Sequence, residues 1–252
     1  MANNKVTIDG RTIIDLSQDT VTSSDDIAEG KYAHLRTGAR VLGTGQGSSS
    51  NPLSGKIIAV TGDSICRGVG NNNNGYAEII AENNGMTVQN LSAGGATVAT
   101  GTGQAGIIST SVGSLRSDAD YIILEGGVND PDFNVSLGTL TSGYTATLTT
   151  TTFAGGFEYM LKSALERFPG KKIGYVFVHK CGNFTDSWYS IAKQACEKWG
   201  IPYCDLNTQA PPLGYITALA NAYTSSGDGF HPNADGYNAY YVPKITAWLK
   251  TL

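Results

Sequence analysis

The sequence predicts an α/β fold in which a parallel sheet lies between two layers of helices. Five short runs rich in Ile, Val, Leu and Tyr alternate with five helical patterns of about ten residues or more. The runs cover residues 56–61, 86–91, 121–125, 172–178 and 201–206, and the helical patterns fall near residues 75–84, 104–116, 156–167, 187–199 and 233–250. Strands separated by helices of this length pair in parallel through crossover connections. We therefore expect a three-layer α/β/α sandwich.

Composition narrows the class of protein. The chain has 252 residues, of which 40% are apolar and 15% are charged, and this is enough to bury one full core. The net charge is −4 and no run of Lys or Arg occurs, which disfavours nucleic acid as a partner. No apolar stretch approaches the length of a membrane span.

The first residues lack the apolar core of a secretory signal. We therefore expect synthesis in the cytoplasm, followed by association with a virion or release by lysis if the protein acts outside the cell.

Residues 1–46 differ from the rest and predict a small β-rich appendage. Residues 6–16 alternate around the turn-forming pair Asp9-Gly10, which predicts a hairpin, and residues 24–30 predict a short helix. Residues 47–55 contain a Gly/Ser-rich segment and the pair Asn51-Pro52, which predict a linker. The main domain is then expected at residues 56–252.

The four cysteines, Cys66, Cys181, Cys196 and Cys204, show no spacing typical of metal ligands. We expect buried or half-buried free thiols, with a Cys196–Cys204 disulfide as the alternative. Neither a metal nor another cofactor is predicted.

Two segments far apart in the chain supply the parts of a nucleophilic hydrolase. Gly62-Asp63-Ser64 follows the first apolar run, so Ser64 is expected at the end of a strand. Asp228 precedes His231 by three residues in a loop near the C-terminus, close enough to orient the imidazole as a base for a serine. Of the other histidines, His34 is expected to be exposed in the appendage. His179 ends a strand and is expected to be structural, with a place at the site as the alternative.

Two further polar turns follow predicted strands. Asn90-Leu91-Ser92-Ala93-Gly94-Gly95-Ala96-Thr97 follows the second run, and Gly126-Gly127-Val128-Asn129-Asp130 follows the third. In parallel sheets, ligands bind beyond the carboxyl ends of the strands. Ser64, Gly95 and Asn129 are therefore expected along one edge of the sheet, whereas Asp63, Asp130 and Asp235 are expected to cap turns.

These four segments, in this order, resemble the blocks of the SGNH (GDSL-type) hydrolase family. The similarity extends over about residues 56–252 and implies the flavodoxin-like sandwich of that family. It also implies a Ser64-His231-Asp228 triad and an oxyanion hole formed by the N–H groups of Ser64 and Gly95 and by the side chain of Asn129. The spacing from Asn90 favours Gly95 over the neighbouring Gly94.

The resulting hypothesis is a metal-independent serine esterase that acts on short acyl esters such as O-acetyl groups on polysaccharides. The segments expected to border the cleft, 67–76, 131–155 and 207–230, are rich in Gly, Asn, Thr, Ser and Asp. Their scattered aromatic residues suit a sugar better than an alkyl chain, and are Tyr76, Phe133, Tyr144, Phe153, Tyr215, Tyr223 and Phe230.

Two alternatives stay open. One is a lipase, thioesterase or lysophospholipase that uses the same residues. The other is a binding or structural protein with a vestigial site, because residues 19–45 are similar to short modules of phage tail proteins. That similarity implies a phage tail or another large particle as a partner of the appendage.

Overall fold

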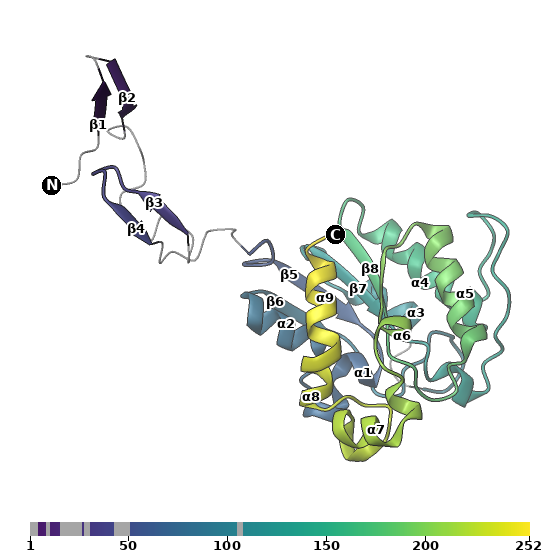
Figure 1. Ribbon diagram of the computed structural model, residues 1–252. Coiled ribbons are helices and arrows are strands. Elements are labelled where there is room, and N and C mark those ends of the chain that lie inside the picture. The colour runs from purple at the N-terminus through teal and green to yellow at the C-terminus, as the bar shows by residue number, and fades with distance from the viewer. Residues whose placement is uncertain (1–4, 9–10, 16–26, 28–30, 43–50, 105–107) are drawn as a thin grey trace. The chain divides into compact units, whose positions relative to one another are not determined.

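The computed structural model describes residues 5–8, 11–15, 27, 31–42, 51–104 and 108–252. The chain divides into two compact units, Met1–Pro52 and Leu53–Leu252. Figure 1 shows the elements of both units.

The N-terminal unit contains two antiparallel hairpins. Strand β1 (Lys5–Ile8) pairs with β2 (Arg11–Asp15), as the Asp9-Gly10 pattern predicts. Strand β3 (Tyr32–His34) pairs with β4 (Arg40–Leu42), and His34 is exposed as expected. The helix predicted at residues 24–30 lies outside the described residues, except for Ile27.

The second unit is built on a five-stranded parallel sheet. Its strands are β5 (Ile57–Thr61), β6 (Thr87–Asn90), β7 (Tyr121–Glu125), β8 (Lys172–Phe177) and β9 (Tyr203–Asp205). Their order is β6-β5-β7-β8-β9, and every pair of neighbours is parallel. All five predicted strands are thus present, and the predicted three-layer fold is confirmed.

Helices cover both faces of the sheet, which explains why all five residues of β7 are buried. Helix α2 (Tyr76–Asn84) contacts α9 (Val242–Leu249) on one face. On the other face, α4 (Phe153–Arg167) contacts α3 (Ile108–Ser111) and α5 (Asp186–Trp199) (Figure 1). Short helices complete the unit: α1 (Ser64–Arg67), α6 (Leu206–Gln209), α7 (Thr217–Tyr223) and α8 (Ala234–Gly236).

The strand order changes direction at β5. The chain passes from β5 to β6 on one side of it and then to β7 on its other side. Connections that leave a strand in opposite directions open a crevice at its carboxyl end, where α/β proteins bind ligands. Ser64 follows β5 and Asn129 follows β7, so both residues lie at this edge of the sheet.

Two predicted helices differ from those observed. The pattern at 104–116 forms only the four residues of α3 and a 3₁₀ turn at Val112–Ser114, and residues 105–107 lie outside the described part. The pattern at 233–250 is divided into α8, a π-helical turn at Tyr237–Tyr241 and α9. A π-turn contains one extra residue per turn, which a 3.6-residue pattern does not distinguish from an α-helix.

The cysteines, all of which lie in the described part of the chain, are free and buried. The expected free thiols are thus confirmed, and the alternative Cys196–Cys204 disulfide is not formed. Among the described helices, none has the length and apolar character that crossing a membrane requires.

Candidate active site

Ser64 lies at the sharp turn between β5 and α1, where it is the first residue of the helix. Asp63 caps this helix, because its Oδ1 accepts the N–H of Ile65 at 2.8 Å, as expected from its position. The turn also needs glycine at position 62, since a Cβ there would overlap the Glu125 carboxylate. Local chemistry therefore holds the serine at the carboxyl end of β5.

His231 joins Ser64 and Asp228 into one hydrogen-bonded chain. Its Nε2 lies 2.9 Å from Ser64 Oγ, and its Nδ1 lies 2.7 Å from Asp228 Oδ2. Asp228 Oδ1 accepts the backbone N–H groups of Phe230 and His231, which fixes the carboxylate. With Nδ1–H donating to Asp228, Nε2 is the acceptor for the serine hydroxyl. The structure thus brings the three residues predicted as a triad within hydrogen-bond distance.

The environment of Asp228 favours its charged form. Partial burial works to raise the pKa of Asp228, but the N–H groups of His231 and Phe230 outweigh it and hold that pKa below its ordinary value. Asp228 is therefore an anion at neutral pH and can stabilise a charged imidazolium on His231.

His179 contacts the histidine loop, residues 228–231, which carries Asp228 and His231. It is fully buried, with Nε2 3.2 Å from the carbonyl oxygen of Gly229 and Nδ1 2.6 Å from the hydroxyl of Tyr241. Burial, opposed in part by the contact with Gly229, lowers the pKa of His179 to about 4, so its ring is neutral at pH 7. The structural interpretation of His179 fits this geometry better than a place in the chemistry.

The second polar turn, residues 90–97, is connected by Asn90 to the turn that carries Ser64. Its side-chain amide donates to the carbonyl oxygen of Cys66 at 3.1 Å and to Glu78 at 2.8 Å, and its Oδ1 accepts the N–H of Ser92. In the same turn Gly95 has φ = +72°, a conformation that favours glycine, whereas Gly94 does not.

Asn129 and Asp130 connect the third turn to the second. One N–H of the Asn129 amide donates to the carbonyl oxygen of Ala96 at 2.9 Å. The buried Asp130 carboxylate accepts the N–H groups of Val98 and Ala99, each at 2.9 Å. Burial raises the pKa of Asp130 to about 7 although these hydrogen bonds oppose it. Asp130 therefore connects the asparagine turn, residues 126–130, to the glycine turn, residues 90–97.

Glu125 lies next to the turn that carries Ser64 and was not predicted from the sequence. It is the last residue of the buried strand β7, and its Oε2 accepts the backbone N–H of Asp63 at 3.0 Å. Both carboxyl groups are fully buried. Burial raises the pKa of Asp63 to about 6, and burial together with the Asp63 charge raises the pKa of Glu125 well above its ordinary value. Of the two carboxyl groups, we therefore expect Glu125, whose pKa is raised by both burial and the neighbouring charge, to be the one that holds a proton. The sequence signal for Glu125 is a glutamate at the end of an otherwise apolar strand.

The raised pKa of Glu125 leads to a testable prediction about stability. We expect Glu125→Gln to melt within about 2 °C of the wild type, because an amide resembles a neutral carboxyl group. Glu125→Ala leaves the buried N–H of Asp63 unpaired and should cost about 2 kcal/mol or more, which is roughly 4–8 °C.

The measurement is thermal unfolding at pH 5 and pH 8. The pKa of Asp63 is higher in the folded protein than in the unfolded chain. Its contribution to the free energy of unfolding is therefore fully present below the unfolded pKa and is lost as pH rises through about 6. The decrease in Tm from pH 5 to pH 8 that Asp63 causes should therefore appear in both the wild type and Glu125→Gln. A Gln variant as unstable as the Ala variant would show that Glu125 is ionised.

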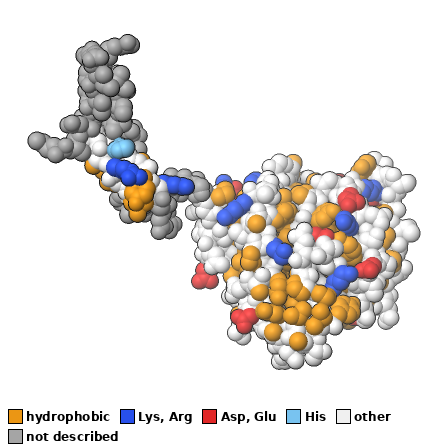
Figure 2. All heavy atoms as spheres, viewed as in Figure 1, with side chains coloured by type: hydrophobic (Ala, Val, Ile, Leu, Met, Phe, Trp, Pro, Cys, Tyr) orange, Lys and Arg blue, Asp and Glu red, His pale blue; other side chains and the backbone are white. Residues whose placement is uncertain are grey.

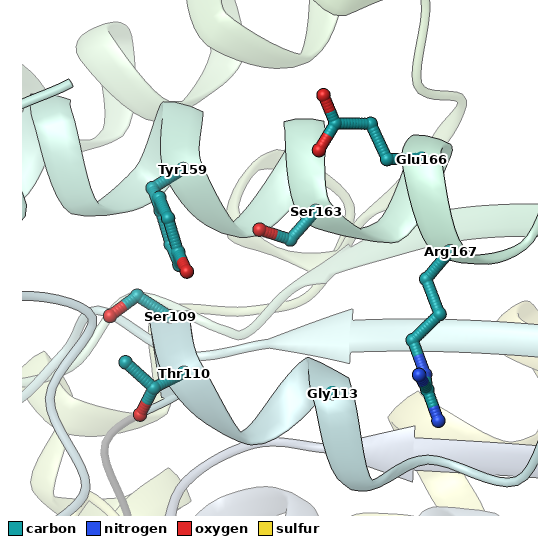
Figure 3. A pocket seen from close by; sticks show the side chains of 7 residues that line it. All are labelled: Ser109, Thr110, Gly113, Tyr159, Ser163, Glu166 and Arg167. Atoms are coloured by element: carbon teal, nitrogen blue, oxygen red, sulfur yellow. The ribbon is translucent and has the colours of Figure 1, made fainter. Parts of the chain in front are cut away.

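A separate cavity of about 430 Å³ lies between α3 and α4 (Figure 3). Ser109, Thr110 and Gly113 line it from one side, and Tyr159, Ser163, Glu166 and Arg167 line it from α4. Neither Ser64 nor His231 borders this cavity, so it is distinct from the site described above.

Comparison with solved structures shows the same fold in several other proteins. A protein from Lactobacillus plantarum has 24% sequence identity and a TM-score of 0.66, and the match covers 79% of this chain and 98% of that one. A family two carbohydrate esterase from Clostridium thermocellum, in complex with cellohexaose, has 16% identity and a TM-score of 0.54, over 78% of this chain and 64% of that one. Phospholipase A1 from Streptomyces albidoflavus has 16% identity and a TM-score of 0.56, over 77% and 99%.

A comparison with curated proteins finds no match. The model of the GDSL-like lipase/acylhydrolase family, however, matches residues 60–239. The matched segment begins within β5, includes the turns that carry Ser64, Gly95 and Asn129, and ends after His231. Since it spans well over half of the sequence, the chain belongs to the GDSL-like lipase/acylhydrolase family.

Proposed function

We propose that this protein is a serine esterase in which Ser64 is the nucleophile, His231 the base and Asp228 the residue that orients the base. The observation that carries the proposal is the continuous hydrogen-bonded chain from Ser64 Oγ through His231 to Asp228, at 2.9 and 2.7 Å. Serine attacks poorly at neutral pH unless an adjacent base accepts its proton, and this arrangement supplies that base.

The reaction follows from the positions of the three groups. Ser64 Oγ attacks the ester carbonyl carbon as His231 Nε2 takes its proton, and the imidazolium then gives that proton to the leaving alkoxide. An acyl group remains on Ser64. Water, deprotonated by His231, attacks this acyl-enzyme and releases the acid and the free serine.

The oxyanion of the tetrahedral intermediate needs preorganised donors. We assign them to the N–H groups of Ser64 and Gly95 and to the side chain of Asn129. These residues follow three neighbouring strands, β5, β6 and β7, at the same edge of the sheet. Asn129 donates one amide N–H to the carbonyl oxygen of Ala96, the residue after Gly95. Its amide has a second N–H, which we assign to the substrate.

For the substrate we propose a short acyl ester, with O-acetyl groups on a polysaccharide as the natural case. The similar fold of a carbohydrate esterase in complex with cellohexaose supports this class. Among the aromatic residues expected at the cleft, Tyr215 is 60% exposed, in keeping with contacts to a sugar. Tyr144 is equally exposed but packs on Trp199 at the C-terminal end of α5, so we do not assign it to the cleft. Tyr76 and Phe153 are fully buried, so the expectation that they border the cleft was wrong. They follow a glycine and a threonine at helix starts and point into the core.

A lipase is the second candidate, because phospholipase A1 from Streptomyces albidoflavus has a similar fold. The two candidates differ in how the enzyme binds the acyl chain. Each buried CH₂ contributes about 0.8 kcal/mol, so a lipase that buries its acyl chain gains from every added carbon pair.

A series of p-nitrophenyl esters separates these candidates. We expect kcat/KM to be highest for acetate and to fall by about tenfold or more between acetate and hexanoate. A maximum at octanoate or longer would support the lipase. The remaining alternative, a binding protein with a vestigial site, predicts that a fluorophosphonate probe leaves Ser64 unlabelled, whereas the esterase predicts labelling.

A further inference from the structure

A cavity of about 370 Å³ lies beside the histidine loop, at the carboxyl end of β8. It is formed by the connection between β8 and α5 and by the segment that follows α6. Lys180, Phe184, Thr185, Asp186, Pro212 and Tyr215 line it. Its volume lies in the range of small-molecule sites.

Close packing joins this cavity to the loop that carries His231. Gly182 lies against the ring of Phe230, and a Cβ at position 182 would overlap that ring. The ring of Phe230 is in turn 6.1 Å from the ring of His231. Gly214 packs on Gly229 so closely that a Cβ at Gly214 would lie 3.0 Å from the Gly229 carbonyl oxygen. The walls of the cavity therefore adjoin the histidine loop directly.

The same β8–α5 connection also contacts the turn that carries Asn129. Asn183 Nδ2 donates to Asp132 Oδ1 at 2.6 Å, and Asp132 lies three residues after Asn129. The ring of Phe184 packs near Gly127, where an added Cβ would lie 3.3 Å from it. The connection thus reaches from the histidine loop to the asparagine turn.

The chemistry decides which part of an ester this side of the site receives. His231 delivers its proton to the departing alkoxide, so the alcohol part of the substrate must lie on the side of His231. A cavity that adjoins the histidine loop is therefore placed for the alcohol and not for the acyl group.

The side chains around the cavity combine an aromatic ring with hydrogen-bonding groups. Tyr215 is 60% exposed, and its hydroxyl donates to the carbonyl oxygen of Gly182 at 2.8 Å, which holds the ring at the wall. Lys180 Nζ and Asp186 Oδ1 are 3.2 Å apart, and both side chains are open to solvent. An aromatic ring beside paired donors and acceptors suits a pyranose ring, which has apolar C–H groups on its face and hydroxyls at its edge.

We propose that this cavity is a leaving-group subsite that binds a pyranose unit of the glycan alcohol, with Tyr215 against the sugar face and Lys180 and Asp186 at its hydroxyls. The inference rests on the proposed esterase function and deepens it. It assigns substrate selection to the β8–α5 connection and to Tyr215.

The test compares two substrates that share an acetyl group but differ in the alcohol. For Tyr215→Ala we expect KM for O-acetylated cellohexaose to rise by about tenfold, while kcat/KM for ethyl acetate, whose alcohol has no ring for Tyr215 to contact, stays within about twofold of the wild type. Tyr215→Phe retains the ring and should keep KM within about threefold. Tyr144→Ala is the matched control, because Tyr144 is equally exposed but packs on Trp199 and donates to Lys198 away from this cavity.

A binding experiment separates failure of the subsite from failure of the proposed function. Cellohexaose is titrated into the inactive Ser64→Ala variant and into the Ser64→Ala/Tyr215→Ala double variant, with binding followed by calorimetry. Binding by the first and a loss of about tenfold in the second support the subsite, even if O-acetylated cellohexaose is not hydrolysed. No binding by the first, or equal losses on both substrates in the kinetic test, would overturn it.

Discussion

The Ser64→Ala variant should lose ester hydrolysis by about 10⁶ in kcat, because loss of a triad nucleophile removes the covalent route altogether. The hydroxyl that is removed is the one 2.9 Å from His231 Nε2. The measurement is the steady-state rate with p-nitrophenyl acetate, together with the loss of labelling by a fluorophosphonate probe.

The fold should survive this change. The Ser64 hydroxyl contacts His231, and the adjacent helix cap is made by Asp63 and not by Ser64. An unchanged circular dichroism spectrum and a Tm within a few degrees of the wild type are the control. Turnover within about tenfold of the wild type would remove Ser64 from its assigned role.

Asp228→Asn should lower kcat by about 10⁴ without disturbing the histidine loop. An asparagine can still accept the N–H groups of Phe230 and His231 through its carbonyl oxygen, at the position of Asp228 Oδ1. Its NH₂ group then faces His231 Nδ1, which must become an acceptor. The proton moves to Nε2, so the ring donates to Ser64 instead of accepting its proton.

The measurement is kcat for the same ester, with Asp118→Asn as the matched control. Asp118 is an exposed carboxylate bonded to Arg116 at 2.6 Å on the surface, so its variant should keep wild-type activity. A loss of less than about tenfold in Asp228→Asn would show that the carboxylate does not set the tautomer of His231.

The contacts that were predictable from the sequence are local or follow from strand ends. Asp228 and His231 are three residues apart, so a single loop brings them together whatever the rest of the chain does. Ser64, Gly95 and Asn129 each follow a strand of a parallel sheet, and all carboxyl ends of such strands meet at one edge. The five apolar runs predicted these strands because a strand covered on both faces must be apolar along its length.

The contact between Asp63 and Glu125 was not predictable from the sequence. These residues are 62 positions apart, and their approach depends on the register between β5 and β7, which pairs Thr61 with Leu124. A sequence pattern shows that a strand is buried but carries no information about its register or its neighbour. The depths of Tyr76 and Phe153 were wrongly predicted for the same reason, since they depend on which helix faces pack on the sheet.

The sequence by itself determined the fold class, the order of the strands along the chain and the three residues that now form the hydrogen-bonded chain from Ser64 to Asp228, because periodicity and short spacings are properties of the chain alone. Only the tertiary structure decided that Glu125 contacts the turn that carries Ser64, that His179 contacts the loop that carries His231, and that the β8–α5 connection forms a cavity beside this loop. These features arise from packing between segments 50 or more residues apart, or from loops whose path depends on their neighbours, and that packing is fixed only when the whole sheet and its helices have assembled.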